Sequence, residues 1–85
     1  MKIYKTKEFL KRLKSLPGSI QKLCERQEKI FSVDWKDPRL HTQKLKNGDP
    51  IFSFRITRKY RVLFVLTESN SVLFVSIGHR KDIYD

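Results

Sequence analysis

Apolar side chains recur along the chain with two different periods, and each period predicts one kind of element. A short alternation over Lys2–Lys5, with Ile3 between basic residues, predicts a strand that lies against a sheet. Helical spacing follows, with apolar positions three or four residues apart from the N-cap residue Thr6 to Leu16. After a Pro-Gly break the same spacing resumes over residues 20–31. These patterns predict a strand followed by a helical hairpin.

The second half of the chain alternates with a period of two, as half-buried strands do. Two turns, Arg58–Lys59 and Glu68–Ser71, separate three such runs: Ile51–Thr57, Tyr60–Thr67 and Val72–Gly78. The middle run is apolar on both sides, which is typical of a central strand. The order of elements predicts an α+β fold, in which the helical hairpin packs on one face of an antiparallel sheet of three hairpin-linked strands.

Between the helices and these strands lies Trp35–Pro50, which has two prolines, an Asn-Gly pair and no sustained period. We predict a long connecting loop here, and long loops are often functional. With 85 residues, 39% of them hydrophobic, the chain is expected to form a single domain over residues 1–85. No apolar run is long enough to span a bilayer and the lysine-rich start does not fit a signal peptide, so we expect a cytoplasmic protein without a membrane partner. The lone cysteine, Cys24, is expected in the core.

The net charge distinguishes this chain from an ordinary small domain. There are 19 Lys and Arg residues against 9 Asp and Glu, which gives a formal net charge of +10. Both halves of the chain carry the excess, so it belongs to the folded surface rather than to a basic tail. Such a surface suits a nucleic-acid groove or a strongly acidic protein partner.

Arginines of the strand region are the strongest chemical candidates. If the first two long strands pair as a hairpin, Arg55 and Arg61 project from the same side of the sheet. His79, Arg80 and Tyr84 follow the end of the last strand and could converge with them. The guanidinium group binds phosphate in bidentate fashion and keeps its charge, which suits a phosphate-binding or phosphoryl-transfer site. A solvated face of a strand hairpin is the alternative interpretation.

Other chemistries find little support in the sequence. The carboxylates are scattered and the glycines stand singly, so neither a metal site nor a glycine-rich phosphate loop is predicted, and no cofactor is expected. His41 is expected to be an exposed loop residue without a partner. Lys44 and Lys46 flank Leu45, which would place both lysines on one side of an extended segment, either in contact with phosphate or simply solvated.

Three stretches of the sequence resemble the RelE/ParE superfamily of bacterial and archaeal toxins from type II toxin–antitoxin systems. They are the run KLK at residues 44–46, the run FRITRKYRVLF at residues 54–64 and the run IGHRKDIY at residues 77–84. The length of the chain and the helical hairpin also fit this superfamily. The resemblance implies a RelE-like fold and a messenger RNA endonuclease that acts on the ribosome, inhibits translation and is held inactive by an acidic antitoxin.

The resemblance also implies roles for particular residues. The catalytic surface of RelE-like members corresponds here to Arg55, Arg61, Arg80 and Tyr84. Thr57 stands where many members have a second basic residue, which could reduce activity. His79 stands where some members have another basic residue, so its imidazole could transfer a proton. Further basic side chains are expected to bind the RNA backbone: Lys44, Lys46, Arg58, Lys59 and Lys81.

In such an enzyme the ribose 2′-hydroxyl attacks the neighbouring phosphate, giving a cyclic phosphate and a free 5′-hydroxyl without a metal ion. Retention of Arg61, Arg80 and Tyr84 favours this ribonuclease branch. The ParE branch has the same scaffold, lacks the ribonuclease residues and acts on DNA gyrase by binding it. A basic nucleic-acid-binding module without catalytic activity is a third alternative.

Overall fold

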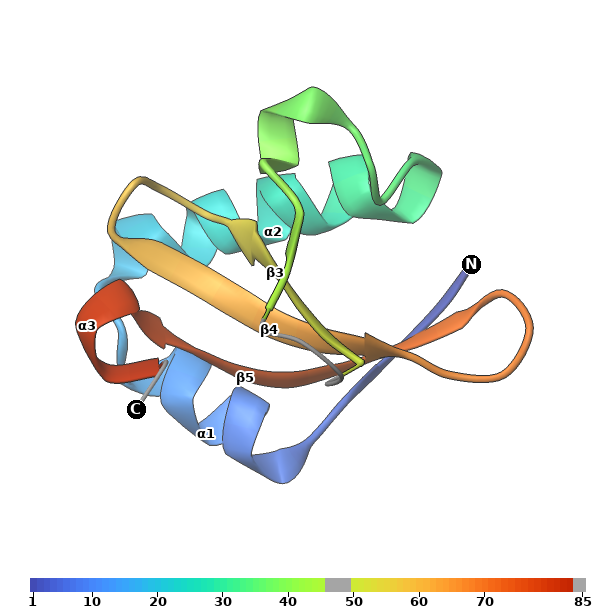
Figure 1. Cartoon of the computed structure of the whole chain (residues 1–85). Coiled ribbons are helices and arrows are strands. Elements are labelled where there is room, and N and C mark those ends of the chain that lie inside the picture. Colours follow the sequence, from blue (N-terminus) through green and yellow to red (C-terminus); the bar gives the residue numbers. More distant parts are fainter. Residues whose placement is uncertain (46–49, 84–85) are drawn as a thin grey trace.

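The computed structural model describes residues 1–45 and 50–83 of the chain. It contains helices α1 (Lys7–Ser15), α2 (Gly18–Val33) and α3 (Arg80–Ile83), the 3-10 helix η1 (Pro38–Leu40), and strands β1 (Lys2–Lys5), β2 (Gln43–Lys44), β3 (Ile51–Arg55), β4 (Tyr60–Leu66) and β5 (Ser71–His79). In Figure 1, α3 lies at the end of β5 next to the connection between β3 and β4, and the β4–β5 turn lies at the opposite end of the sheet.

The five strands form one sheet in the order β1-β5-β4-β3-β2. The three long strands are antiparallel neighbours, as predicted, and the α+β fold class is confirmed. Two edge strands extend this sheet. β1 pairs with β5 in parallel and makes the sheet mixed. β2, which lies inside the segment predicted to be a loop, pairs with β3. Two residues are too few to show a period, so the hydrophobic pattern of the sequence does not predict β2.

One face of the sheet is covered by the helices, and phenylalanine rings fill the space between the layers. The ring of Phe31 on α2 lies 5.0 Å, 4.9 Å and 5.2 Å from those of Phe54, Phe64 and Phe74. Phe9 on α1 contacts the same Phe74 ring at 5.5 Å. All five side chains are fully buried, and each contributes about 2 kcal/mol or more of hydrophobic stabilisation.

Helix α1 is attached to β5 through its N-cap. Oγ1 of Thr6 accepts a hydrogen bond from the amide of Phe9 at 3.0 Å, which confirms the predicted cap. The same hydroxyl donates to the carbonyl oxygen of Val75 at 2.7 Å, and the Thr6 amide donates to the carbonyl oxygen of Phe74 at 3.1 Å. These bonds hold α1 beside the second half of β5, beyond the end of β1.

The other face of the sheet has two chemically different halves. Near the β4–β5 turn, four register partners on four strands form a row that we call the apolar row: Tyr4, Leu73, Val65 and Ile51. Tyr4 is 54% exposed and the other three are half-buried. Towards the opposite end, the register partners are Arg55, Arg61 and Gly78. The exposed sheet face therefore changes from apolar to basic along the strands.

Cys24 lies in the core, as predicted, with 2% of its surface exposed. Burial, together with the nearby Glu28 carboxylate, raises the pKa of its thiol to about 12, so the sulfur stays protonated and unreactive at neutral pH. Within the described parts of the chain, no helix has the length and apolar character needed to cross a membrane.

Candidate functional site

Arg55 and Arg61 lie directly opposite each other on β3 and β4. Their neighbours Phe54 and Val62 are fully buried under the helices, so both arginines project from the other face of the sheet. Directly opposed residues of an antiparallel pair have Cβ atoms about 5 Å apart. The predicted placement of these two side chains on one side is therefore confirmed, and we call them the arginine pair.

The arginine pair is not neutralised by any carboxylate in residues 1–45 and 50–83. The ion pairs of this part of the chain are Lys5 with Glu28, Arg12 with Glu8, and Arg39 with Asp37. Like charges directly opposite each other destabilise a sheet. In addition, Nε of Arg55 is buried and has no hydrogen-bond acceptor among the described residues. A buried unsatisfied donor costs about 1–3 kcal/mol, so this arrangement favours an anionic ligand.

A cavity of about 210 Å³ adjoins Arg55 at the end of β3. Its lining is Gln27, Arg39, His41, Arg55, Ile56, Thr57 and Arg58. Gln27 of α2 closes one side, where its Nε2 donates to the carbonyl oxygen of Arg55 at 2.9 Å. His41 is exposed, as expected, but it has Arg55 and Arg58 as neighbours across this cavity. The sequence does not predict this proximity, because no periodic signal links the segment around residue 41 to β3.

Arg39 is the most constrained cation of this cavity. Its Nε and Nη2 donate to Oδ1 and Oδ2 of Asp37 at 3.0 Å and 2.9 Å, in the bidentate arrangement that arginine and carboxylate favour. These side-chain hydrogen bonds lower the pKa of Asp37 to about 2, so the carboxylate is ionised at neutral pH. Because Asp37 compensates the charge of Arg39, the net positive charge of the cavity comes from Arg55 and Arg58.

Helix α3 places another basic group at this end of the sheet. The amide of Arg80 donates to the carbonyl oxygen of Lys59 at 2.7 Å, which joins the start of α3 to the β3–β4 turn. The bond joins two segments, about twenty residues apart, that carry two exposed basic residues each: Arg58, Lys59, Arg80 and Lys81. Four of the predicted RNA-contacting or catalytic residues are thus neighbours at the end of the sheet.

His79 is oriented by its surroundings. Its ring lies 5.5 Å from the Tyr60 ring at an interplanar angle of 75°, and Nδ1 accepts a hydrogen bond from the amide of Lys81 at 3.1 Å. A neutral imidazole that accepts at Nδ1 carries its proton at Nε2. His79 is the register partner of Tyr60, whereas Gly78 is the register partner of Arg61. Because neighbouring residues of a strand point to opposite faces, the side chain of His79 leaves the strand on the face opposite to the arginine pair.

Lys44, a predicted RNA-binding residue, is not brought to the arginine pair. Lys44 on β2 is the register partner of Phe52, whose ring stacks on Phe64, so Lys44 lies on the side of the sheet that the helices cover. Lys46 and Tyr84 fall outside the described residues.

Comparison with known proteins gives a likeness in structure. No protein-family model and no curated protein matches the sequence. Solved structures do match over nearly their whole length. A chain of the RelB–RelE antitoxin–toxin complex from Methanococcus jannaschii is 26% identical with a TM-score of 0.78, and the match covers 96% of this chain and 95% of that one.

Two further structures agree in fold at lower identity. For the archaeal RelE–RelB complex from Pyrococcus horikoshii OT3, identity is 16% and the TM-score 0.78, with 95% and 96% of the two chains covered. For YafQ from E. coli strain BL21(DE3), identity is 10% and the TM-score 0.80, with 98% and 97% covered.

Proposed function

We propose that this chain, which has the fold of the RelE-like toxins, is the toxin of a type II toxin–antitoxin system and acts as an endoribonuclease on messenger RNA. The observation that carries the proposal is the arginine pair on the exposed sheet face, with the buried and unsatisfied Nε of Arg55. Two guanidinium groups held side by side at a cost in stability are expected where a phosphate binds.

The chemistry follows from how charge changes during cleavage. When a ribose 2′-hydroxyl attacks the adjacent phosphate, the pentacoordinate transition state carries more negative charge than the ground state. Arg55 and Arg61 would bind that charge more tightly than they bind the substrate, which lowers the barrier. Arg80, at the start of α3, supplies a further cation at the same end of the sheet. The products are a cyclic phosphate and a free 5′-hydroxyl.

Proton transfer is assigned to Tyr84 or His79, and the hydrogen bond at Nδ1 favours Tyr84. The Nδ1 lone pair of His79 is engaged by the amide of Lys81, so the neutral ring has no free basic nitrogen. The hydroxyl of Tyr84 is then the remaining candidate for proton transfer. In this proposal His79 orients α3 and Tyr84 moves the proton.

An acidic antitoxin is the proposed partner. The net charge of +10 favours an acidic protein, and the apolar row offers half-exposed aliphatic surface next to the arginine pair. Val65 and Arg61 are four residues apart on β4, about 13 Å along the strand. An antitoxin segment with an apolar stripe and an acidic end at that separation would cover both surfaces and block access to RNA.

Single-turnover cleavage on ribosomes programmed with a labelled message tests this function. Arg61→Ala removes a donor to the transition state, so we expect cleavage to slow by about 10²-fold or more. Arg26→Ala is the control matched in charge, because Arg26 is exposed on α2 at the opposite face of the sheet. We expect this variant to cleave within about twofold of the parent, since the change reaches the substrate only as long-range charge.

The alternatives predict different outcomes in the same system. Intact messages with gyrase-dependent DNA breaks would indicate a ParE-like toxin. RNA binding without any new 5′ ends would indicate a basic nucleic-acid-binding module. Equal rates for Arg61→Ala and the parent would exclude the arginine pair as the catalytic surface.

A further inference from the structure

Gly78 occupies the position next to the arginine pair on β5. It is the register partner of Arg61, which in turn faces Arg55, so the three positions lie side by side on three neighbouring strands. The first two positions carry guanidinium groups and the third has no side chain. Yet Gly78 is buried, so another group covers it.

The covering groups are the side chains of Arg12 and Ile83. A Cβ atom at Gly78 would lie 3.4 Å from Nη1 of Arg12 and 4.0 Å from Cβ of Ile83. Cβ atoms of register partners point to the same face of a sheet. Nη1 of Arg12 therefore lies at van der Waals distance from the place where a side chain of residue 78 would begin, beside Arg61 and on the same face.

Arg12 lies on α1, far from Gly78 in the sequence, and its charge is only weakly compensated. Its described ion-pair partner is Glu8, with Nε and Oε2 3.9 Å apart, a separation too long for a hydrogen bond. The side chains are 45% and 59% exposed, so this ion pair is worth little. The guanidinium group of Arg12 is thus available to an anion that lies on the sheet face.

We propose that Arg12 is a further phosphate-binding arginine of this site, which holds the RNA backbone beside the nucleotide that is cleaved. The inference rests on the proposed ribonuclease function. Neighbouring strands are about 4.8 Å apart, so the positions of Arg55, Arg61 and Gly78 span about 10 Å across the sheet. That length accommodates more than one phosphate of a single strand, so Arg12 binds a flanking phosphate while the arginine pair binds the scissile one.

The absence of a side chain at Gly78 is part of this arrangement. A Cβ atom at residue 78 would already touch Nη1 of Arg12, and the further atoms of a longer side chain would have to share the space with the guanidinium group. Glycine leaves room for a side chain from another element to approach the strand closely there.

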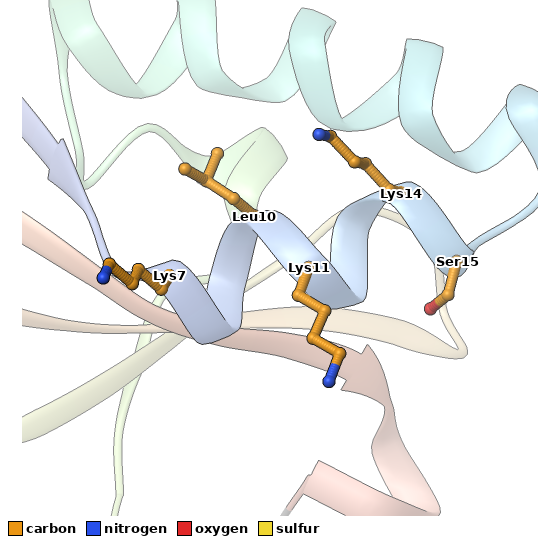
Figure 2. Close-up of a pocket in the computed structure, with 5 residues that line it drawn as sticks. All are labelled: Lys7, Leu10, Lys11, Lys14 and Ser15. Carbon is orange, nitrogen blue, oxygen red and sulfur yellow. The ribbon is translucent and has the colours of Figure 1, made fainter.

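The test compares Arg12→Met with Lys14→Met in cleavage and in binding of a fluorescent single-stranded RNA oligonucleotide. Methionine keeps an unbranched apolar stem and removes the charge. Both residues are exposed on α1, and Figure 2 shows Lys14 beside Leu10 on one side of that helix, where both line a separate shallow hollow. Lys14→Met therefore loses the same charge away from Gly78.

For Arg12→Met we expect KM to rise about fivefold or more with kcat changed less than about twofold, because a flanking phosphate is bound equally in the ground state and the transition state. The slope of log affinity against log salt concentration should become shallower by about one phosphate contact. Lys14→Met should leave both measurements near those of the parent. Equal effects of Arg12→Met and Lys14→Met would mean that only overall charge matters and would overturn the inference.

Gly78→Val provides the second, independent variant. It should raise KM in the parent, because the methyl groups beyond Cβ crowd the guanidinium of Arg12, and it should have no further effect on KM in the Arg12→Met background. Additive effects of the two changes would contradict the proposal. If the parent protein neither binds nor cuts RNA, the proposed function fails. If the parent cuts RNA and Arg12→Met cuts it equally well, only the proposed role of Arg12 is refuted.

Discussion

At the scale of single residues, the site is a set of cations that the fold holds together against their mutual repulsion. Arg55 and Arg61 face each other without a described counter-ion, and Nε of Arg55 is buried without an acceptor among the described residues. Arg39 shows the contrasting case, since Asp37 satisfies its guanidinium group in bidentate fashion. The arginines without a described carboxylate partner, rather than the one paired with Asp37, are therefore the residues expected to bind phosphate.

Variants of His79 and Tyr84 test which of these two residues transfers the proton. His79→Asn retains an acceptor oxygen close to the place of Nδ1 and loses Nε2, whereas His79→Gln moves its polar group away from the amide of Lys81. If His79 mainly orients α3, His79→Asn keeps most of the cleavage rate and His79→Gln loses more. Tyr84→Phe, which removes only the hydroxyl, should slow cleavage by about 10²-fold or more.

Single-turnover rates of these three variants decide between the two roles. A loss in His79→Asn as large as in Tyr84→Phe would assign proton transfer to the imidazole instead. Thermal unfolding of each variant shows whether the change acts through stability.

At the scale of elements, α1 contributes to the site only because Thr6 attaches it to β5. The Thr6 hydroxyl makes two hydrogen bonds, one within the cap and one to Val75. Those bonds determine where the first turn of α1 starts, and the second turn then brings Arg12 to Gly78. A cap residue near the N-terminus thus positions a charge at the opposite end of β5.

Thr6→Ala should therefore lower the free energy of unfolding by about 1–2 kcal/mol, the usual cost of losing an N-cap, with the bond to Val75 adding to it. Thr6→Ser keeps the hydroxyl and should recover most of this stability. Urea unfolding monitored through Trp35 fluorescence measures both variants. A stability of Thr6→Ala equal to that of the parent would show that these bonds do not hold α1 in place.

At the scale of the whole molecule, the exposed sheet face has two ends of different chemistry, which suit two different partners. Its basic end suits RNA, and its apolar row suits a protein segment. A second copy of this chain is a poor occupant of the apolar row, because two molecules of net charge +10 repel each other. In the proposed function, an acidic antitoxin would cover both halves at once and would inhibit the toxin by occlusion.

The double variant Val65→Thr/Leu73→Thr tests this occlusion. We expect it to bind the antitoxin about tenfold more weakly or worse, since two central apolar contacts become polar while the β-branched shape suits the strands. The antitoxin is identified as the protein whose co-expression abolishes growth arrest. Leu10→Gln, which changes an exposed apolar residue on α1, is the matched control and should bind like the parent. Unchanged affinity in the double variant, measured by calorimetry, would place the antitoxin elsewhere.

Local features of the sequence determined most of the elements. The N-cap at Thr6, the helical spacing of α1 and α2 and the alternation of β3, β4 and β5 depend on neighbours a few residues apart. The shared face of Arg55 and Arg61 follows from alternation across a single hairpin. The sequence also predicted the α+β fold class, because hairpin-linked strands need no long-range information to find their partners.

Only the tertiary structure decided the contacts between distant segments. The parallel pairing of β1 with β5, the cavity that joins His41 to Arg55 and the approach of Arg12 to Gly78 each bring together residues from separate elements. No period within one segment encodes such contacts. They arise because the helices must bury their phenylalanines on one face of the sheet, and that packing sets where every side chain at the edges of the site comes to lie.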